Sequence, residues 1–284
     1  MHELTSVPEI RAWTGAQRAA GRRIALVPTM GFLHEGHLAL VDEARRRADS
    51  VVLSIFVNPL QFGPREDLSR YPRDLPRDRA LASGRGVDTI FVPPASDMYP
   101  AGSEVRVVAG PMADRWEGAA RPGHFTGVLT VVAKLFHLTQ PDVACFGQKD
   151  IQQLTLVRRM VRDLDWPLEI ATVRTVREAD GLAMSSRNAY LAPADRARAV
   201  VLSRALRAAH DGWRTGETRA DALEVRMRDE LGKEPGVTVE YIAVADPESL
   251  APVQTADDTT IVALAARIGS TRLIDNIVLA QGTD

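Results

Sequence analysis

The sequence predicts an α/β fold in which a doubly wound parallel sheet is followed by a smaller α+β region. Short and nearly continuous apolar runs, such as residues 51–57, are typical of parallel strands buried on both faces. Segments with helical spacing of apolar residues separate these runs up to about residue 173. Beyond residue 190 helical segments come first and alternating strands follow, which is the order of an α+β domain.

The N-terminal part begins with a short helical lead-in over residues 1–23. Apolar runs then predict strands at 24–27, 51–57, 89–92, 143–146 and 168–173, and a further strand is expected at 104–108. Helical spacing predicts helices at 36–48, 74–84 and 125–138 and after residue 150. Pro59 and Pro93 follow two of the strands closely, and proline cannot continue a central ladder, so these loops lie at carboxyl ends of strands.

A domain boundary is expected near residue 176, which gives domains of residues 1–175 and 176–284. A polar connector, residues 180–188, follows the boundary, and its Ser-Ser-Arg loop is expected to close over the site of the first domain. The second domain is expected to contain a long helix from Pro193 to about 214, a helix at 218–231, and strands at 237–245, 259–267 and 271–279.

Composition excludes several classes of protein. The chain has 284 residues, of which 45% are hydrophobic and 25% charged, as in ordinary globular proteins. A net charge of −2 gives no excess of positive charge for nucleic acid. A single cysteine excludes an internal disulfide and fits a reducing compartment. No apolar run approaches the ~20 residues that span a bilayer, and no signal-peptide core is seen. We therefore expect a cytoplasmic protein with no nucleic-acid or membrane partner.

The stretch PTMGFLHEGH at residues 28–37 organises the N-terminal part. It connects an apolar strand to a helix, so Gly31, His34, Gly36 and His37 lie on a strand-to-helix turn, where open α/β sheets bind ligands. Glycine allows close approach to the backbone, and the helix start suits phosphate. Either histidine alone could cap the helix or fill a gap. A zinc-protease site is not indicated, because its histidines stand at i and i+4 and these stand at i and i+3.

Two further segments carry cations toward the same kind of site. Residues 147–150 repeat the strand-to-helix arrangement with Lys149, and Arg187 lies in the Ser-Ser-Arg loop. Two cations and two imidazoles suit a triphosphate. Asp150 either holds Mg²⁺ through water or caps its helix. No residue is an obvious nucleophile, because Cys145 lies inside a predicted buried strand. Catalysis is therefore expected from positioning and charge stabilisation.

Three neutral amides accompany these charged groups: Asn58, Gln61 and Gln153. Amides can hold a carboxylate without neutralising its charge, which suits a carboxylate that must itself attack. The alternative is that they are polar loop residues facing water, and for Asn58 the two interpretations are left open.

The chain resembles the pantothenate synthetases, or pantoate–β-alanine ligases, over nearly its whole length. The matching segments are PTMGFLHEGH, FVNPLQF, YPRD, RPGHFTGV followed by VVAKLF, PDVACFGQKDIQQ and GLAMSSRNAYL. The HEGH element alone would indicate only the wider nucleotidyltransferase superfamily, and an enzyme of that superfamily acting on another small acid or cofactor precursor is the alternative. A nucleotide-sensing module without turnover is the rival from another class.

The resemblance implies a Rossmann-like N-terminal domain, a C-terminal lid domain and a homodimer. It implies that (R)-pantoate and β-alanine are joined with ATP and Mg²⁺ through a pantoyl-adenylate. It places ATP at Met30, Gly31, Phe32, Leu33, His34, Glu35, Gly36, His37, Gly147, Gln148, Lys149, Asp150, Val176, Met184, Ser185, Ser186 and Arg187. It places pantoate at Gln61 and Gln153, and β-alanine at Gln61.

Within this set, His37 is implied to be the proton donor, and His34, Lys149 and Arg187 are implied to act in catalysis beside it. Arg187 would be the sole cation of the lid loop. Gln148 stands where many relatives have glutamate, and we expect it to face solvent. Residues near Mg²⁺, with Asp78 as one candidate, are left open.

Overall fold

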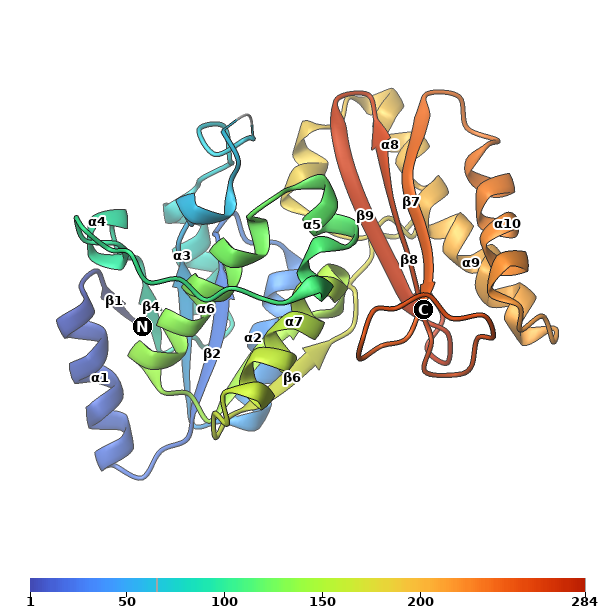
Figure 1. Ribbon diagram of the computed structural model, residues 1–284. Coiled ribbons are helices and arrows are strands. Elements are labelled where there is room, and N and C mark those ends of the chain that lie inside the picture. Colours follow the sequence, from blue (N-terminus) through green and yellow to red (C-terminus); the bar gives the residue numbers. More distant parts are fainter. Residues whose placement is uncertain (65, 284) are drawn as a thin grey trace. The chain divides into compact units, whose positions relative to one another are not determined.

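The computed structural model describes residues 1–64 and 66–283, which form two compact units (Figure 1). The N-terminal unit consists of Met1–Gly147 and Gln152–Arg174, apart from residue 65. The C-terminal unit consists of the chain from Thr175 onward together with the short segment Gln148–Ile151. The chain therefore leaves the first unit for four residues and then returns to it.

A six-stranded parallel sheet forms the centre of the N-terminal unit. The order of its strands is β1-β4-β3-β2-β5-β6. Their bounds are His2–Leu4 (β1), Ile24–Thr29 (β2), Ser50–Ile55 (β3), Thr89–Phe91 (β4), Val143–Gly147 (β5) and Glu169–Val173 (β6). The predicted α/β class is confirmed.

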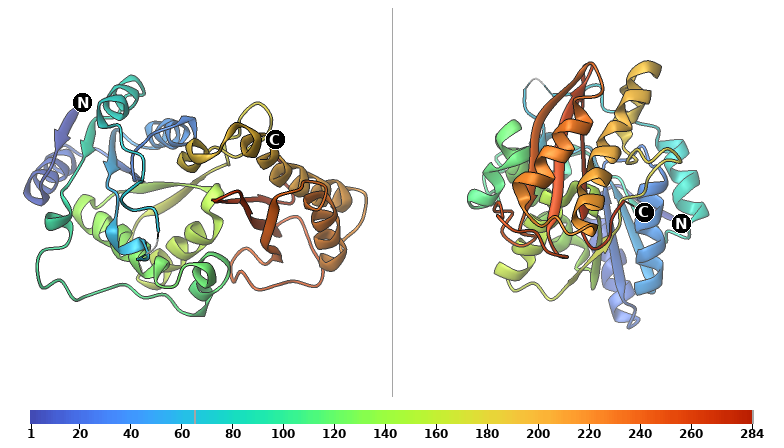
Figure 2. Two further views of the ribbon diagram at one scale, coloured as in Figure 1. Left: turned by 90° about the horizontal axis from the view of Figure 1, so that it is seen from above. Right: turned by 90° about the vertical axis from the view of Figure 1, so that its right-hand side faces the viewer.

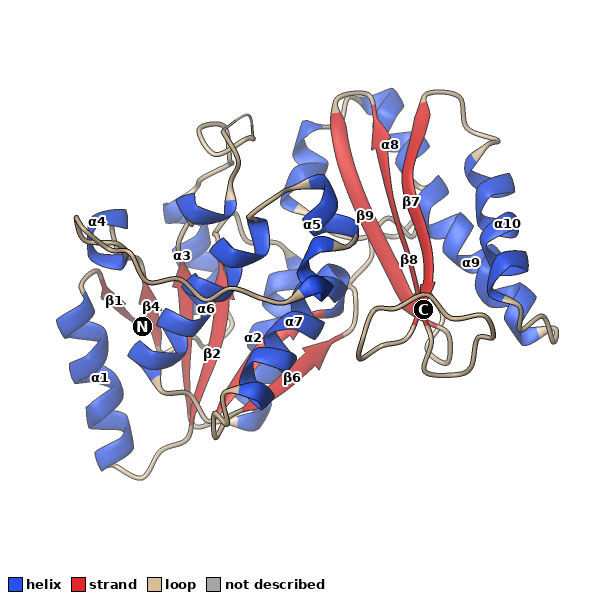
Figure 3. Ribbon diagram, viewed as in Figure 1, coloured by secondary structure: helices blue, strands red, loops and turns tan. Residues whose placement is uncertain are grey.

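Helices cover both faces of this sheet (Figures 2 and 3). Helices α2 and α3 lie on one face, and α2 contacts β2, β3 and β5. Helices α1 and α6 pack against each other and on β2. From β2 the chain adds strands toward one edge of the sheet, and from β5 it adds a strand toward the other edge. Because the strand–helix–strand crossovers are right-handed, the helices of the two halves lie on opposite faces of the sheet. The bounds are Val7–Ala19 (α1), Glu35–Arg47 (α2), Leu75–Gly84 (α3), Ala95–Met98 (α4), Trp116–Ala120 (α5), His124–Thr139 (α6) and Ile151–Asp163 (α7).

The central strands are apolar along their length because helices bury both of their faces. Residues 24–27 of β2 and 51–53 of β3 are fully buried. Cys145 in β5 is also fully buried, as predicted, and burial raises the pKa of its thiol to about 12. This thiol is core packing and not a nucleophile.

The order of the strands reverses where β2 and β5 lie side by side. These two strands pair through Ala25 and Val143, and their carboxyl ends lie at the same edge of the sheet. In open α/β sheets ligands bind at such a switch point. The strand-to-helix turn at residues 30–37 follows β2, and Gly147 ends β5, so the first two predicted ATP segments begin at this edge.

The C-terminal unit contains an antiparallel sheet in the order β7-β8-β9. Helix α9 contacts β8 and β9, helix α10 contacts β7, and the two helices pack on each other (Figure 1). The bounds are Pro193–Ala199 (α8), Val201–Arg214 (α9), Ala220–Leu231 (α10), Val237–Ala245 (β7), Ile261–Ile268 (β8) and Thr271–Val278 (β9).

Three details of the predicted elements are wrong. Residues 104–108 alternate in polarity but form no strand within the described chain, and Val105 and Val108 are 88% and 73% exposed. The expected long helix from Pro193 is broken at Val200 into α8 and α9. The short strand β1 was missed, because three residues with polar ends carry no pattern. In the described part of the chain, no helix is long and apolar enough to cross a membrane.

Candidate active site

The turn after β2 has a backbone shape that requires glycine. Gly31 has a φ of +84°, and a Cβ there would lie 2.9 Å from Ile55 Cγ2 and 3.0 Å from Asp78 Oδ2. Phe32, the next residue, is also left-handed with a φ of +52°. Left-handed backbone suits glycine, and here close contact excludes a side chain as well.

A buried carboxylate holds this turn in place. Asp78, from the first turn of α3, accepts hydrogen bonds from the backbone N–H groups of Phe32 (2.8 Å) and Leu33 (2.7 Å), one on each oxygen. Arg77 donates to the carbonyl of Leu33 (2.9 Å) and lies over the Phe32 ring. Asp78 therefore shapes the turn.

The two imidazoles lie side by side at the start of α2. Their ring centroids are 4.0 Å apart. His34 caps the helix, since its Nδ1 accepts from the N–H of Gly36 (3.2 Å), and Nδ1 of His37 accepts from the N–H of His34 (3.3 Å). The capping interpretation of His34 is thus correct.

Glu35 lies between the two histidines in sequence but its side chain has another partner. Its exposed carboxylate forms an ion pair with Arg85 (2.7 Å). Among the residues of the turn, the donors suited to phosphate are therefore the imidazoles and the backbone.

Gln61 is held by both its side chain and its backbone. It ends the 3₁₀ turn Pro59–Gln61 (η1), and its Oε1 accepts from Asn58 Nδ2 (3.1 Å) while its Nε2 donates to Met30 Sδ (3.4 Å). Its carbonyl is bonded by His124 Nδ1 (2.8 Å) and Arg121 Nη2 (3.2 Å). Gln61 is therefore fixed beside the first residue of the turn that carries the histidines.

Asn58 is a buried structural link and not a solvated loop residue. Its Nδ2 also donates to the carbonyl of Gly127 (3.0 Å), and its Oδ1 accepts from the hydroxyl of Tyr99 (2.8 Å). Burial raises the pKa of Tyr99, so its hydroxyl stays protonated and can donate. A Cβ on Gly127 would lie 2.2 Å from the carbonyl oxygen of Leu60, so only glycine lets α6 approach this turn.

The neighbouring amides at the start of α7 have different environments. Gln152 is buried and fully committed, since it accepts from the N–H of Glu117 (3.0 Å) and donates to the carbonyls of Met112 (3.0 Å) and Arg115 (2.8 Å). Gln153 is only partly buried. Gln152 is therefore a structural amide, whereas the side chain of Gln153 is partly exposed.

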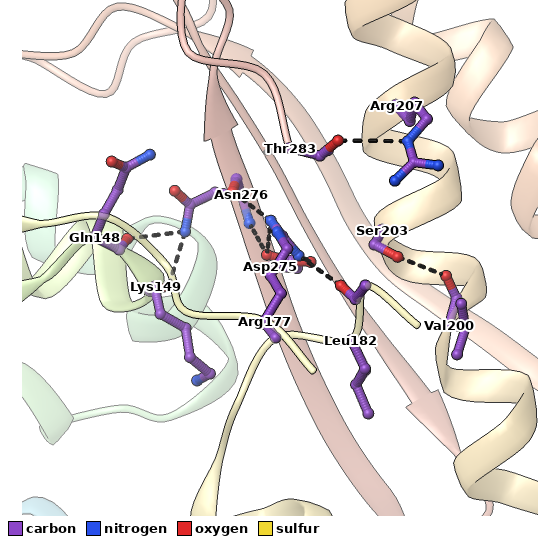
Figure 4. A network of polar contacts seen from close by, with 12 residues as sticks. Gln148, Lys149, Arg177, Leu182, Val200, Ser203, Arg207, Asp275, Asn276 and Thr283 are labelled. Atoms are coloured by element: carbon purple, nitrogen blue, oxygen red, sulfur yellow. Dashed lines mark hydrogen bonds and ion pairs between the residues drawn. The ribbon is translucent and has the colours of Figure 1, made fainter. Parts of the chain in front are cut away.

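The Lys149 turn belongs to the C-terminal unit, where an asparagine on β9 holds it (Figure 4). Asn276 Nδ2 donates to the carbonyls of Gln148 (3.0 Å) and Lys149 (2.8 Å). Lys149 Nζ lies 3.7 Å from Oδ1 of the exposed Asp150. The prediction that Gln148 faces solvent is wrong: it is 4% exposed, because this contact keeps the turn against β9.

The predicted lid segment forms a small hairpin in the same unit. The carbonyl of Val176 accepts from the N–H of Met184 (2.9 Å), and Arg177 bridges Ala183. Ser185 then caps the short 3₁₀ helix Ser186–Tyr190 (η4), its hydroxyl accepting from the N–H of Arg187 (3.3 Å). All the residues that the sequence assigned to the lid therefore lie on one hydrogen-bonded segment.

Sequence reasoning missed several residues that shape the site. Tyr99, Arg121, His124 and Asn276 lack a local pattern that marks them, and Asp78 was considered only as a candidate near Mg²⁺. For Arg121 and His124, the one available signal was their occurrence inside the matching segment RPGHFTGV.

Phosphate donors at the switch point of a parallel sheet, beside a fixed amide that can hold a carboxylate, are the features of an enzyme that activates an acid with a nucleotide. A model of the family described as pantoate-beta-alanine ligase matches residues 2–278. The chain belongs to the pantoate–β-alanine ligase family, and its members are ligases.

Relatives and solved structures agree with this assignment. Pantothenate synthetase of Moorella thermoacetica is 50% identical over 98% of this chain and 99% of the relative, and that of Roseiflexus sp. strain RS-1 is 52% identical over 98% and 99%. The crystal structure of pantothenate synthetase from Thermus thermophilus matches with 49% identity and a TM-score of 0.93 over 98% and 99%. Pantoate-beta-alanine ligase from Francisella tularensis, complexed with beta-gamma ATP and beta-alanine, matches with 32% identity and a TM-score of 0.82 over 100% of both chains.

Proposed function

We propose that this chain condenses (R)-pantoate with β-alanine through a pantoyl-adenylate, forming pantothenate, AMP and pyrophosphate. Family membership supports the overall reaction. The observation that carries the mechanism is the contact of Gln61 with Met30, because it joins an amide suited to a carboxylate with the turn that bears the two imidazoles.

In the first half-reaction, a carboxylate oxygen of pantoate attacks the α-phosphorus of ATP and pyrophosphate leaves. His37 donates the proton or hydrogen bond to the phosphate oxygens, with His34 beside it. Lys149 and Arg187 neutralise charge that develops on the triphosphate. Neutral Gln61 and Gln153 hold pantoate without removing the charge that makes its carboxylate nucleophilic.

In the second half-reaction, the amine of β-alanine attacks the acyl carbon of the adenylate. The bond to AMP breaks, and the amine loses a proton as the amide forms. Gln61 also holds β-alanine, so the acyl carbon and the attacking amine are bound next to each other. Orientation of two bound reactants can supply roughly 7 kcal/mol or more of the barrier reduction in good cases.

The two units have separate roles in this scheme. The N-terminal unit carries the proposed pantoate residues and the ATP residues 30–37, and the C-terminal unit, the proposed lid, carries residues 148–150, Val176 and residues 184–187. Support comes from the division of the predicted ATP residues between the units.

Mg²⁺ accompanies ATP in this proposal. The part of the chain that the structure describes holds no group of three or more His, Cys, Asp or Glu side chains arranged for a metal. Mg²⁺ at nucleotide sites is usually held by phosphates, waters and one or two carboxylates. Exposed Asp150, beside Lys149, fits such a role. When bound, the ion neutralises charge on the triphosphate.

Pyrophosphate exchange tests the first half-reaction without the second. Enzyme, Mg²⁺, ATP, pantoate and labelled pyrophosphate are incubated without β-alanine, and label should return to ATP. Gln61→Ala and Gln153→Ala should raise the pantoate concentration needed for half-maximal exchange, because each removes an amide that holds the acid.

Two results would contradict the scheme. Exchange that appears only after β-alanine is added would show that no separate adenylate forms. Exchange that proceeds equally well without pantoate would remove the substrate assignment and favour another nucleotidyltransferase reaction. Gln152→Ala is not a suitable control, since Gln152 ties three backbone groups together.

A homodimer and a cytoplasmic location complete the proposal. The extended residues 103–110 carry the exposed Val105 and Val108 on a segment whose backbone forms no ladder within the described residues. Such a segment is a ready edge for a second copy of the chain. Cytoplasmic ATP and the single cysteine support the location.

Sedimentation of two variants tests the dimer. Val105→Asp and Val108→Asp should shift the wild-type dimer toward monomer, because a charge in a paired apolar edge is desolvated. Val225→Asp is the matched control, since Val225 is another exposed valine, on α10. A wild-type chain that sediments as a monomer would contradict the dimer, and unchanged dimers in both edge variants would contradict this interface.

A further inference from the structure

We propose that Asn276 on β9 is a positioning residue that fixes Lys149 for catalysis. The inference rests on the proposed role of Lys149 in binding the triphosphate. Asn276 is 2% exposed and lies 127 residues from Lys149 in the chain, and its side-chain amide spans the gap between β9 and the 148–150 turn (Figure 4).

The two hydrogen bonds of Asn276 fix the backbone on both sides of the Lys149 Cα. The carbonyl of Gln148 belongs to the peptide before Lys149, and the carbonyl of Lys149 belongs to the peptide after it. One amide donates to both, at 3.0 and 2.8 Å. Holding both peptide planes sets φ and ψ of Lys149, and with them the direction in which its side chain leaves the turn.

Asn276 is itself held by a buried ion pair. Its N–H donates to Asp275 Oδ1 (2.8 Å), and its carbonyl accepts from Arg177 Nη2 (3.4 Å). Arg177 and Asp275 form an ion pair of 2.6 Å with side chains 11% and 1% exposed. Arg177 also donates to the carbonyl of Gly181 (3.1 Å), inside the hairpin that precedes the lid residues. Neighbouring residues of β9 thus hold the two ATP segments of this unit.

The side-chain oxygen of Asn276 indicates that the N–H groups of the same amide are its important part. Asn276 Oδ1 is buried and has no hydrogen-bond partner among the described residues. A buried oxygen without a partner costs free energy that a leucine of similar size would avoid. The two hydrogen bonds that the side-chain amide donates therefore explain best why asparagine stands at this position. The oxygen without a partner is part of the same amide group.

Loss of those donors should act through Lys149. Lysine is a compact charge on a flexible stem, so its place depends on the backbone that carries it. A misplacement of about 1 Å can lower a rate by roughly 100-fold. Asn276→Leu should lower kcat/KM for ATP in pyrophosphate exchange by about 10- to 100-fold, with the half-saturating pantoate concentration unchanged.

A double-mutant cycle separates positioning from general loss of structure. In the Lys149→Ala background, Asn276→Leu should reduce exchange by no more than about twofold further, because the group that it positions is already gone. Thr283→Val is the matched control: it removes a hydrogen bond to Arg207 (3.4 Å) in the same unit and should retain wild-type exchange. If Asn276→Leu does not fold, Asn276→Ala takes its place throughout.

Amide hydrogen exchange of residues 148–151 in substrate-free protein completes the test. It should be faster in Asn276→Leu than in the wild type or in Thr283→Val. Unchanged amide exchange, a wild-type kcat/KM for ATP, or a loss that multiplies fully with that of Lys149→Ala would each overturn the positioning role. A wild-type chain without pantoate-dependent pyrophosphate exchange would instead overturn the proposed function, and amide exchange still tests the turn in that case.

Discussion

Lys149→Ala and His37→Ala should each slow pantoyl-adenylate formation by about 100-fold while the fold survives. Each removes a donor that is proposed to stabilise charge on the transferring phosphates, and such a loss costs on the order of 3 kcal/mol in the barrier. The turns that carry the two residues lie at the carboxyl ends of β2 and β5, outside the strands themselves. The rate of pyrophosphate exchange measures the loss.

Lys233→Ala is the control for removal of a positive charge. Lys233 lies on the surface of the C-terminal unit, where it pairs with Glu230. Its loss should leave the exchange rate unchanged. Near-wild-type exchange in a folded His37→Ala or Lys149→Ala protein would remove that residue from the mechanism.

Asp275→Ala should lower the free energy of unfolding of the C-terminal unit by about 3 to 5 kcal/mol, because it leaves the buried Arg177 guanidinium without its counter-ion. The carboxylate accepts two hydrogen bonds from Arg177, at 2.6 and 3.0 Å, and one from the backbone N–H of Asn276. Native-state hydrogen exchange of β8 and β9 measures this change in stability, because Asp275 lies on β9.

The control for this change is an ion pair on the surface. Arg219 and Asp221 form one with both side chains largely exposed. Asp221→Ala should leave the exchange of β8 and β9 unchanged, because solvent already screens that pair. If Asp275→Ala behaves like Asp221→Ala, the buried pair does not stabilise the unit.

The parts of the fold that the sequence predicted are those with a local cause. Strands β2 and β3 are buried on both faces, so their residues are apolar in unbroken runs. The turn at residues 30–37 requires glycine, which the sequence displays directly. Residues 104–108 show the limit of this reasoning. Their alternating polarity predicts a strand, but it does not show whether another strand is present to pair with it.

The supporting residues of the site could not be predicted, because their partners are distant in the chain. Asp78 holds a backbone N–H that is 46 residues away, and no spacing rule connects the two. Gln148 was expected to face solvent, yet it is buried in a turn that Asn276 holds from 128 residues away. Asn58 could be interpreted either way, and its environment is set by Tyr99 and Gly127, which come later in the sequence.

The four-residue excursion of Gln148–Ile151 into the C-terminal unit also orders events during biosynthesis. A ribosome releases the N-terminal sheet early, and domains generally fold as units when their residues have emerged. The turn that carries Lys149 emerges at mid-chain, but the amide that fixes it belongs to residue 276 of 284. The nascent chain therefore has the residues of its first sheet long before it has a finished Lys149 turn. A nascent chain stalled before residue 276 would lack this anchor, however complete its first unit.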